Sequence, residues 1–207
     1  MKLKKIASLA LAGIMAVSML TACGEGGKKE EDPSSSEVTT VSGAAEALNA
    51  ALLQNKDVIK FENDSELDKD LEAYYRANPI MGDEWNLSKT YEIVAADNDD
   101  LNKFIDVKHS DWTNFKGMIE DKVGNYYPES RAVVGMFNAE IFTKADALKV
   151  VGTDIDGLDF ASDGSNVKDG KEFVYTGKAS IIEVSSEKGA ASVWVVVAVV
   201  EKDYTTI

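Results

Sequence analysis

The C-terminal third of the chain carries the clearest pattern of apolar and polar positions. Residues 172–184 and 191–203 read as two long strands, and Ser186-Glu187-Lys188-Gly189 between them is typical of a tight hairpin loop. Every residue from Val193 to Val200 is apolar, and six of these eight residues are valine. A strand that is apolar on both faces is typical of a covered, central position. We therefore expect this strand to lie inside a sheet, and the run is too short to span a membrane.

Earlier in the chain, apolar residues recur at helical spacing. The first predicted helix starts at a Ser42 cap, continues to about Gln54 and has an apolar stripe of Ala44, Ala47, Leu48, Ala51 and Leu52. The second is capped by Asn63 or Ser65, ends at Asn78-Pro79, and has a stripe of Leu67, Leu71, Tyr74 and Tyr75. Because such stripes usually pack inside, we expect the tyrosine pair in the core rather than on a ligand platform.

The middle of the chain mixes both periodicities. Residues 89–96 and 103–108 alternate, and the break at Asp97-Asn98-Asp99-Asp100 between them predicts a hairpin. Asp111 is then expected to cap a helix that ends at Gly124, with an apolar stripe of Trp112, Phe115, Ile119 and Val123. Tyr126-Tyr127-Pro128 is predicted to form a turn.

Residues 131–142 fit a strand or a helix, and their β-branched and aromatic residues favour a strand. Thr143 and Asp146 have the spacing of a capping box, which predicts a helix to about Val151 that Gly152 closes. The order of elements indicates an α+β domain, with N-terminal helices packed on one face of an antiparallel sheet that ends in a long C-terminal β-hairpin.

The N-terminus has a different pattern. A short basic head, Met1 to Lys5, precedes an apolar run from Ile6 to Leu20, which is the order of a secretory signal. Leu20-Thr21-Ala22-Cys23 follows and resembles the lipobox of bacterial lipoprotein precursors. That resemblance, which covers residues 1 to 23, implies a diacylglyceryl group on the Cys23 thiol and cleavage before Cys23. The alternative is an ordinary signal peptide whose cysteine remains a free thiol.

These patterns divide the chain into three parts. Residues 1–22 are the expected signal peptide, residues 23–40 a lipidated flexible tether rich in glycine, serine and charge, and residues 41–207 a single globular domain. The order of elements in this domain is faintly similar to cystatin-like and nuclear-transport-factor-like folds. That similarity has no motif behind it, so it implies no function.

Charge narrows the class of partner. The chain has 22 Lys and Arg against 36 Asp and Glu, a net charge of −14. Loss of residues 1–22, which carry three lysines and no acid, makes the mature charge −17. Such a surface repels nucleic acid and anionic headgroups, so the expected membrane contact is the lipid on Cys23 at the extracytoplasmic side of the cell membrane. A single cysteine also provides no intramolecular disulfide.

Motifs for catalysis or cofactors are absent from the sequence. There is no G-x-S-x-G, no H-E-x-x-H and no phosphate-binding glycine loop. His109 is the single histidine and stands beside Ser110 and Asp111, but adjacent residues do not converge as a triad. We expect a surface or capping histidine, no zinc site and no cofactor.

Two acidic loops and one tryptophan have weaker ligand signals. Asp97–Asp100 and Asp154–Asp159 are rich in carboxylates, as calcium loops are, but the spacing of the second departs from the calcium-loop pattern, and a solvated turn is expected for both. Trp112 and Trp194 are expected in the core, whereas Trp85 lies in a polar loop where it can stack on a sugar.

The sequence thus predicts a lipid-anchored envelope protein that is not an enzyme and acts as a binding or interaction module. An envelope protein or a small ligand is its expected partner. The alternatives are a ligand-binding lipoprotein for a sugar or a cation, and an envelope hydrolase that uses paired carboxylates.

Overall fold

The computed structural model describes residues 38–40, 43–80, 90–121, 127–160, 171–185 and 192–206. The chain divides into residues 1–32 and 33–207, and the described residues all belong to the second unit. Several sequence predictions therefore lie outside the described residues, namely those on the signal segment, Cys23, Ser42, Trp85, Gly124, Tyr126 and the loop 186–189. No helix within the described ranges has the length and apolar character needed to cross a membrane.

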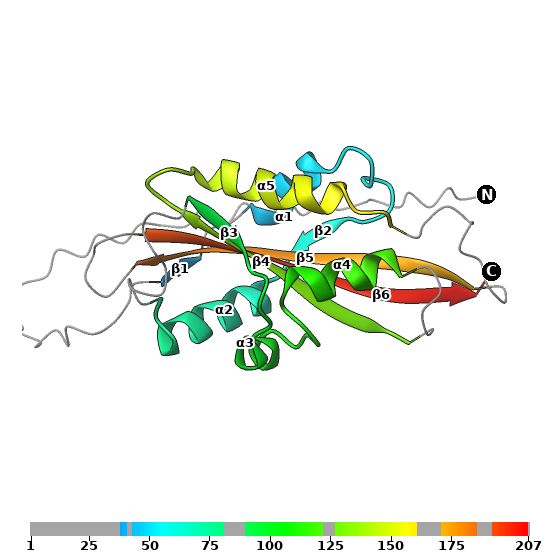
Figure 1. The fold of residues 1–207 in the computed structure, drawn as a ribbon, viewed down its shortest axis with the longest axis horizontal. Coiled ribbons are helices and arrows are strands. Elements are labelled where there is room, and N and C mark those ends of the chain that lie inside the picture. Colours follow the sequence, from blue (N-terminus) through cyan, green and yellow to red (C-terminus); the bar gives the residue numbers. More distant parts are fainter. Residues whose placement is uncertain are drawn as a thin grey trace, which may run out of the picture. The chain divides into compact units, whose positions relative to one another are not determined.

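A mixed sheet of six strands forms the centre of the domain (Figure 1). The strand order is β1-β5-β6-β4-β3, and β2 also pairs with β5. Every pair is antiparallel except β2 with β5, which is parallel. The bounds are Val38–Thr40 for β1, Phe61–Asn63 for β2, Tyr91–Ile93 for β3, Glu129–Asn138 for β4, Lys171–Ser185 for β5 and Ser192–Thr206 for β6. The sheet thus includes residues 38–40, which the sequence pattern assigned to the tether.

The predicted C-terminal hairpin is confirmed. Strands β5 and β6 pair from Lys171 with Thr206 to Ser185 with Ser192. Strand β6 lies between β5 and β4, and its residues from Val193 to Val200 are buried, apart from half-buried Trp194. The apolar run therefore occupies the central position that its pattern predicts, and residues 131–138 of the ambiguous segment form part of strand β4.

Helices cover both faces of this sheet (Figure 1). Helices α1 (Ala44–Ala51), α4 (Trp112–Glu120) and α5 (Lys144–Asp156) share one core with the face of β6 that carries Val196, Ala198 and Val200. Helices α2 (Ser65–Ala77) and α3 (Asp99–Phe104) share the other core with Val195, Val197 and Val199. The α+β class is confirmed, but the expectation of helices on one face is wrong, because a strand that is apolar on both faces needs cover on both.

The predicted hairpin of residues 89–108 is also wrong. Residues 99–104 form helix α3, and Asn98 caps it by accepting hydrogen bonds from the backbone N–H groups of Asp100 and Leu101, at 3.1 and 3.0 Å. Strand β3 instead pairs with β4. Leu101 and Ile105 are buried four residues apart, so this segment follows the helical period.

The caps of the other helices explain where these helices begin. Asp64, rather than Asn63 or Ser65, caps α2 and accepts from the backbone N–H groups of Glu66 and Leu67. Asp111 caps α4 as predicted. The predicted capping box of Thr143 and Asp146 is present at α5. Helix α5 continues past Gly152 to Asp156, so that glycine does not end it.

Asp156 joins the ends of α1 and α5. Its carboxylate accepts hydrogen bonds from the backbone N–H groups of Gln54 and Asn55, at 2.8 and 2.9 Å. The segment compared with a calcium loop is therefore the last helical turn and the residues after it, because Asp154 and Asp156 belong to α5. The solvated turn expected there is wrong for Asp156, which is buried.

Candidate functional site

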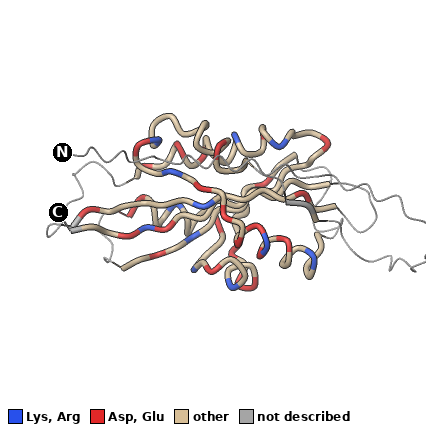
Figure 2. Tube along the Cα trace, turned by 180° about the vertical axis from the view of Figure 1, so that it is seen from behind, with Lys and Arg blue, Asp and Glu red and all other residues tan. Residues whose placement is uncertain are grey.

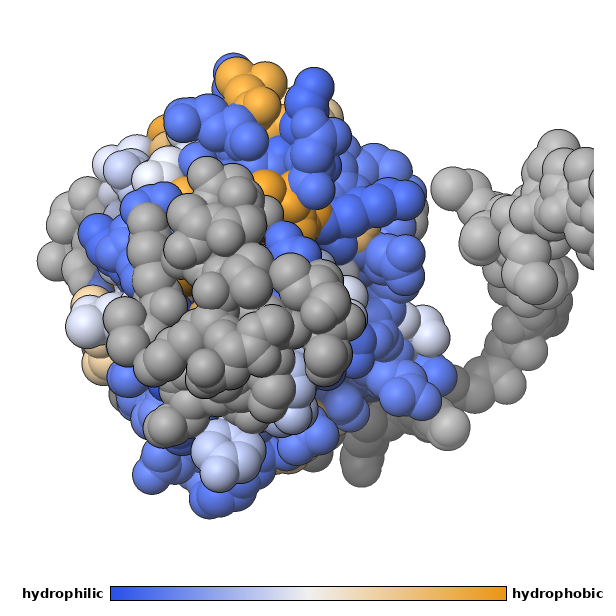
Figure 3. All heavy atoms as spheres, turned by 90° about the vertical axis from the view of Figure 1, so that its right-hand side faces the viewer, coloured by the Kyte–Doolittle hydropathy of each residue, from blue (hydrophilic) through white to orange (hydrophobic). Residues whose placement is uncertain are grey.

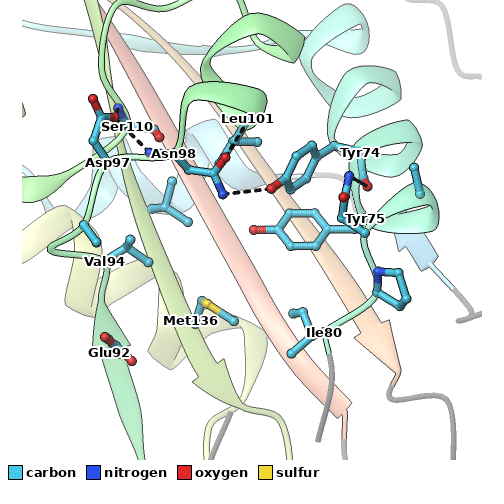
Figure 4. Close-up of a pocket in the computed structure, with 15 residues that line it drawn as sticks. Tyr74, Tyr75, Ile80, Glu92, Val94, Asp97, Asn98, Leu101, Ser110 and Met136 are labelled. Carbon is cyan, nitrogen blue, oxygen red and sulfur yellow. Dashed lines mark hydrogen bonds between the residues drawn. The ribbon is translucent and has the colours of Figure 1, made fainter. Parts of the chain in front are cut away.

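A groove of about 660 Å³ opens on the face of the sheet that carries α2 and α3 (Figure 4). The end of α2 and the following Pro79 and Ile80 form one wall, and β3 with the residues after it forms the opposite wall. Val134 and Met136 of β4 form the apolar floor. The groove thus lies where three segments distant in sequence meet, and no single sequence motif marks it.

The α2 wall is aromatic. Tyr74 and Tyr75 are buried, and their rings make an edge contact with centroids 5.0 Å apart. The Tyr74 hydroxyl accepts a hydrogen bond from the Asn98 side-chain amide at 2.8 Å, which ties α2 to the cap of α3. The Tyr75 hydroxyl points into the groove (Figure 4). Burial raises the pKa of Tyr75 above its ordinary value, so its hydroxyl stays protonated and can donate. The prediction that both tyrosines are buried is confirmed, and they also line a cavity.

Ser110 is a polar residue in the lining of the groove. Its residue is 1% exposed, and its hydroxyl oxygen has no hydrogen-bond partner in the part of the chain that the structure describes. A buried hydroxyl without a partner costs about 1–3 kcal/mol. Most buried side-chain polar atoms in folded proteins have a hydrogen-bond partner, so the Ser110 hydroxyl is a candidate contact for a ligand.

Asp97 fixes the segment after β3, which belongs to the wall opposite α2. One carboxylate oxygen accepts from the Ser110 backbone N–H and the Asn102 side-chain amide, both at 2.9 Å, and the other lies 2.5 Å from His109 Nδ1. Burial raises the pKa of Asp97, but these hydrogen bonds outweigh it and keep the pKa well below its usual range. The carboxylate is therefore charged and connects the loop before α3 to residues 109–110.

His109, expected as a surface or capping residue, is half-buried, and its partner is one that the sequence does not indicate. Its side chain pairs with Asp97, twelve residues earlier, and its backbone forms an isolated parallel β-bridge with Arg131 of β4. Among the described residues the Ser110 hydroxyl has no hydrogen-bond partner, so it does not make the contact with His109 that a triad needs.

Asp97, His109 and Asp111 offer three possible metal-ligand atoms within 4.8 Å of one another. Both carboxylates already accept hydrogen bonds from the protein. Asp111 accepts from the backbone N–H of Asn114 at 3.0 Å and from its side-chain amide at 2.7 Å, as the cap of α4. Capping and loop attachment therefore account for this cluster without an ion.

A second cavity, of about 590 Å³, contains basic side chains. Lys108 and Arg131 both pair with Glu129. Lys202 is buried and donates to the carbonyl oxygens of Met118 and Asp121, at 2.8 and 2.6 Å. These cations are used within the protein, so the cavity has the character of a structural junction between α4 and the sheet.

The remaining candidate ligand residues do not converge. Trp112 and Trp194 pack against the core that α1, α4 and α5 share, as expected. Trp194 Nε1 donates a hydrogen bond to the Phe142 carbonyl oxygen at 3.0 Å. Burial raises the pKa of Asp68 and of Asp154, but Asp68 belongs to α2 and Asp154 to α5, which cover opposite faces. Within the described ranges, no pair of carboxyl groups with raised pKa values lies in the groove.

Exposed apolar surface is scattered. Leu53 and Tyr127 are 75% and 76% exposed, and they belong to different loops. On the face drawn in Figure 3 the described atoms are mostly hydrophilic, with small separate apolar areas.

Comparisons with models of known protein families, with curated protein sequences and with solved structures found no match to this chain.

Proposed function

We propose that the protein is a bacterial lipoprotein, anchored by lipid on Cys23 at the extracytoplasmic side of the cell membrane, whose domain is a non-catalytic binding module. The lipobox resemblance supports the anchor. The groove between α2 and β3 supports the binding role, because it combines an apolar floor with a few inward polar groups, as small-molecule sites do.

The unpaired Ser110 hydroxyl is the observation that carries this proposal. The groove bears the cost of a buried hydroxyl without a partner, while the Tyr75 hydroxyl points into the same space. A ligand that hydrogen-bonds to these two groups recovers that cost and covers the apolar floor.

The groove favours a ligand-binding lipoprotein over an envelope hydrolase. A carboxylate hydrolase would need two converging acids in the groove. Asp97 is committed to His109 and to three N–H groups instead.

The anchor is tested by Cys23→Ala. We expect the variant to be shed into the medium, while the unsubstituted protein stays with the membrane fraction. A variant that remains in the membrane fraction would contradict lipid anchoring.

The groove is tested with phenol as a neutral probe, by ligand-observed NMR on the lipidated full chain in zwitterionic nanodiscs. Ala96 lines the groove and is exposed, so Ala96→Trp is expected to block phenol binding without unfolding the domain. Ala95→Trp is the matched control, since Ala95 is also exposed and is not among the residues that line the groove. Equal binding by both variants would refute the proposed site.

Ser110→Ala gives an independent test. Removal of the unpaired hydroxyl is expected to raise the free energy of unfolding by about 1 kcal/mol while weakening phenol binding. A purely structural serine would not change stability and binding in opposite directions.

A further inference from the structure

We infer that the ligand of this groove is an uncharged molecule with an apolar body and a hydrogen-bond acceptor, such as a carbonyl oxygen. This inference rests on the proposed binding function and names the class of ligand. It follows from the charges in the groove that are already paired, and from the hydroxyl groups that still have hydrogen-bonding capacity.

The two charged residues in the described lining of the groove have partners within the chain. Asp97 pairs with His109 and accepts hydrogen bonds from three N–H groups. Glu92 is also partnered within the chain. The described lining includes no lysine, arginine or histidine that could receive an anion. A charged ligand would lose its water without gaining a counter-charge, so the groove selects uncharged molecules.

Charge elsewhere in the domain does not mark the groove. Acidic positions occur all along the traced domain (Figure 2). Such a charge attracts cations to the surface as a whole. Any cation binding that Ala96→Trp leaves unchanged is therefore surface binding and not binding in the groove.

The tyrosine hydroxyls of the α2 wall have hydrogen-bonding capacity left. The Tyr74 oxygen already accepts from the Asn98 side-chain amide at 2.8 Å, so its own O–H remains to donate. The Tyr75 hydroxyl points into the groove, and no hydrogen bond joins it to another described residue (Figure 4). Because burial keeps this hydroxyl protonated, it can donate as well. Two O–H groups on one wall indicate an acceptor on the ligand.

The apolar lining narrows the class further. Ile80, Leu101, Val134 and Met136 contribute hydrocarbon groups to the groove. A sugar would need many more hydrogen-bonding groups than this lining has. An apolar body with one acceptor oxygen fits both the hydrocarbon lining and the hydroxyl groups.

The test uses four probes built on one six-membered ring. Cyclohexanone is uncharged and has an acceptor, and methylenecyclohexane has the same shape without the acceptor. Cyclohexylammonium and cyclohexanecarboxylate carry a positive and a negative charge at pH 7. Binding is measured by ligand-observed NMR titration with the lipidated full chain in phosphatidylcholine nanodiscs, and empty nanodiscs give the lipid background.

The variant is Tyr75→Phe, which removes the hydroxyl and keeps the buried ring. Tyr91→Phe is the matched control, because Tyr91 is 49% exposed and is not among the residues that line the groove. Ala96→Trp, which fills the groove, shows how much of the binding of each probe belongs to this site.

We expect cyclohexanone to bind at least tenfold more tightly than either charged probe. Tyr75→Phe should weaken cyclohexanone binding about fivefold, the size of one net hydrogen bond between uncharged groups. It should not weaken the binding of methylenecyclohexane, which has no acceptor. Tyr91→Phe should change neither, and Ala96→Trp should block both.

Other outcomes separate this inference from the proposed function. If a charged probe binds more tightly than cyclohexanone and Ala96→Trp blocks it, the uncharged class is wrong and the binding groove stands. If Tyr75→Phe leaves cyclohexanone binding unchanged, or weakens both uncharged probes equally, the acceptor assignment is wrong and the groove again stands. If neither phenol nor any of these four probes binds, both the ligand class and the proposed function are contradicted.

Discussion

Replacing two helical glycines with alanine should change stability in opposite directions. Gly152 lies in α5, where an added Cβ would stand 2.6 Å from the Ala51 side chain and 3.3 Å from the Leu48 carbonyl oxygen of α1. Ordinary van der Waals contact begins at 3.4 Å. Gly117 lies in α4, where an added Cβ meets nothing within 4 Å. One site is a close contact between two helices and the other is open.

The size of each effect follows from these distances. Both substitutions gain about 1 kcal/mol of helix propensity. At Gly152 the new methyl group also forces the two helices apart, and overpacking of this kind costs about 1–3 kcal/mol. The balance for Gly152→Ala is a loss of about 1 kcal/mol, and for Gly117→Ala a gain of about 0.5–1 kcal/mol.

Urea denaturation followed by circular dichroism measures both changes. With a slope of about 1.5 kcal/mol/M, a loss of 1 kcal/mol lowers the midpoint by about 0.7 M. Combining Gly152→Ala with Ala51→Gly should recover about 1 kcal/mol relative to the sum of the single changes, because the opposing methyl group is gone. Equal stabilisation by Gly152→Ala and Gly117→Ala would refute the close-contact argument.

Three charged side chains give further predictions. Lys202→Met should lower the free energy of unfolding by about 2 kcal/mol, because two carbonyl oxygens at the end of α4 lose their hydrogen-bond donor. Removal of the buried charge offsets this loss only in part. An unchanged melting temperature would contradict this prediction. Asp97→Asn should cost about 2 kcal/mol at pH 7 through the lost charged contact with His109. Because the pKa of Asp97 is lowered in the folded protein, its charge stabilises the fold at pH values above the ordinary Asp pKa of about 4. The difference in free energy of unfolding between Asp97→Asn and the unsubstituted chain should therefore shrink as denaturation is repeated at lower pH. Asp68→Asn should stabilise the domain by about 0.5–1 kcal/mol at pH 7, because burial raises the pKa of Asp68 and an amide oxygen still accepts the hydrogen bond from Ser180. This gain should disappear at pH values below that raised pKa. A gain that does not depend on pH would contradict the role of the buried charge.

The sequence predicts the C-terminal hairpin well because its signal is local and redundant. In β6 the same apolar run specifies strand, central position and burial on both faces. Because both faces of β6 are apolar, the same run also indicates that helices cover both faces of the sheet. The order of elements alone indicates one covered face. The caps at Asp111 and Thr143 were predictable for a similar reason, since the whole motif lies within four residues.

The errors arise where a residue is used by a distant partner. Asn63 is a good cap by type, but its side chain instead accepts from the Ala45 backbone N–H and donates to Glu46, so Asp64 caps α2. In the α3 segment the short alternation of residues 103–108 predicts a strand, whereas the Asn98 cap and the burial of Leu101 and Ile105 follow the helical period.

The groove has no signature in the sequence because its walls come from α2, β3 and β4. A sequence pattern specifies that Tyr75 is apolar and helical, but not which space its hydroxyl enters. In the sequence, Ser110 stands out only as a neighbour of His109. What marks Ser110 is a buried hydroxyl without a partner among the described residues. This property depends on the folded arrangement of β3 and β4, so the sequence does not display it.

The central position of β6 also affects the order in which the domain can fold. Strand β6 follows every other described element in the sequence, yet both helical layers pack against it. Neither core can be completed until β6 has joined the sheet. For a chain that is exported as proposed, the earlier segments therefore remain without a finished core throughout translocation, and the domain closes only after its last long strand has emerged.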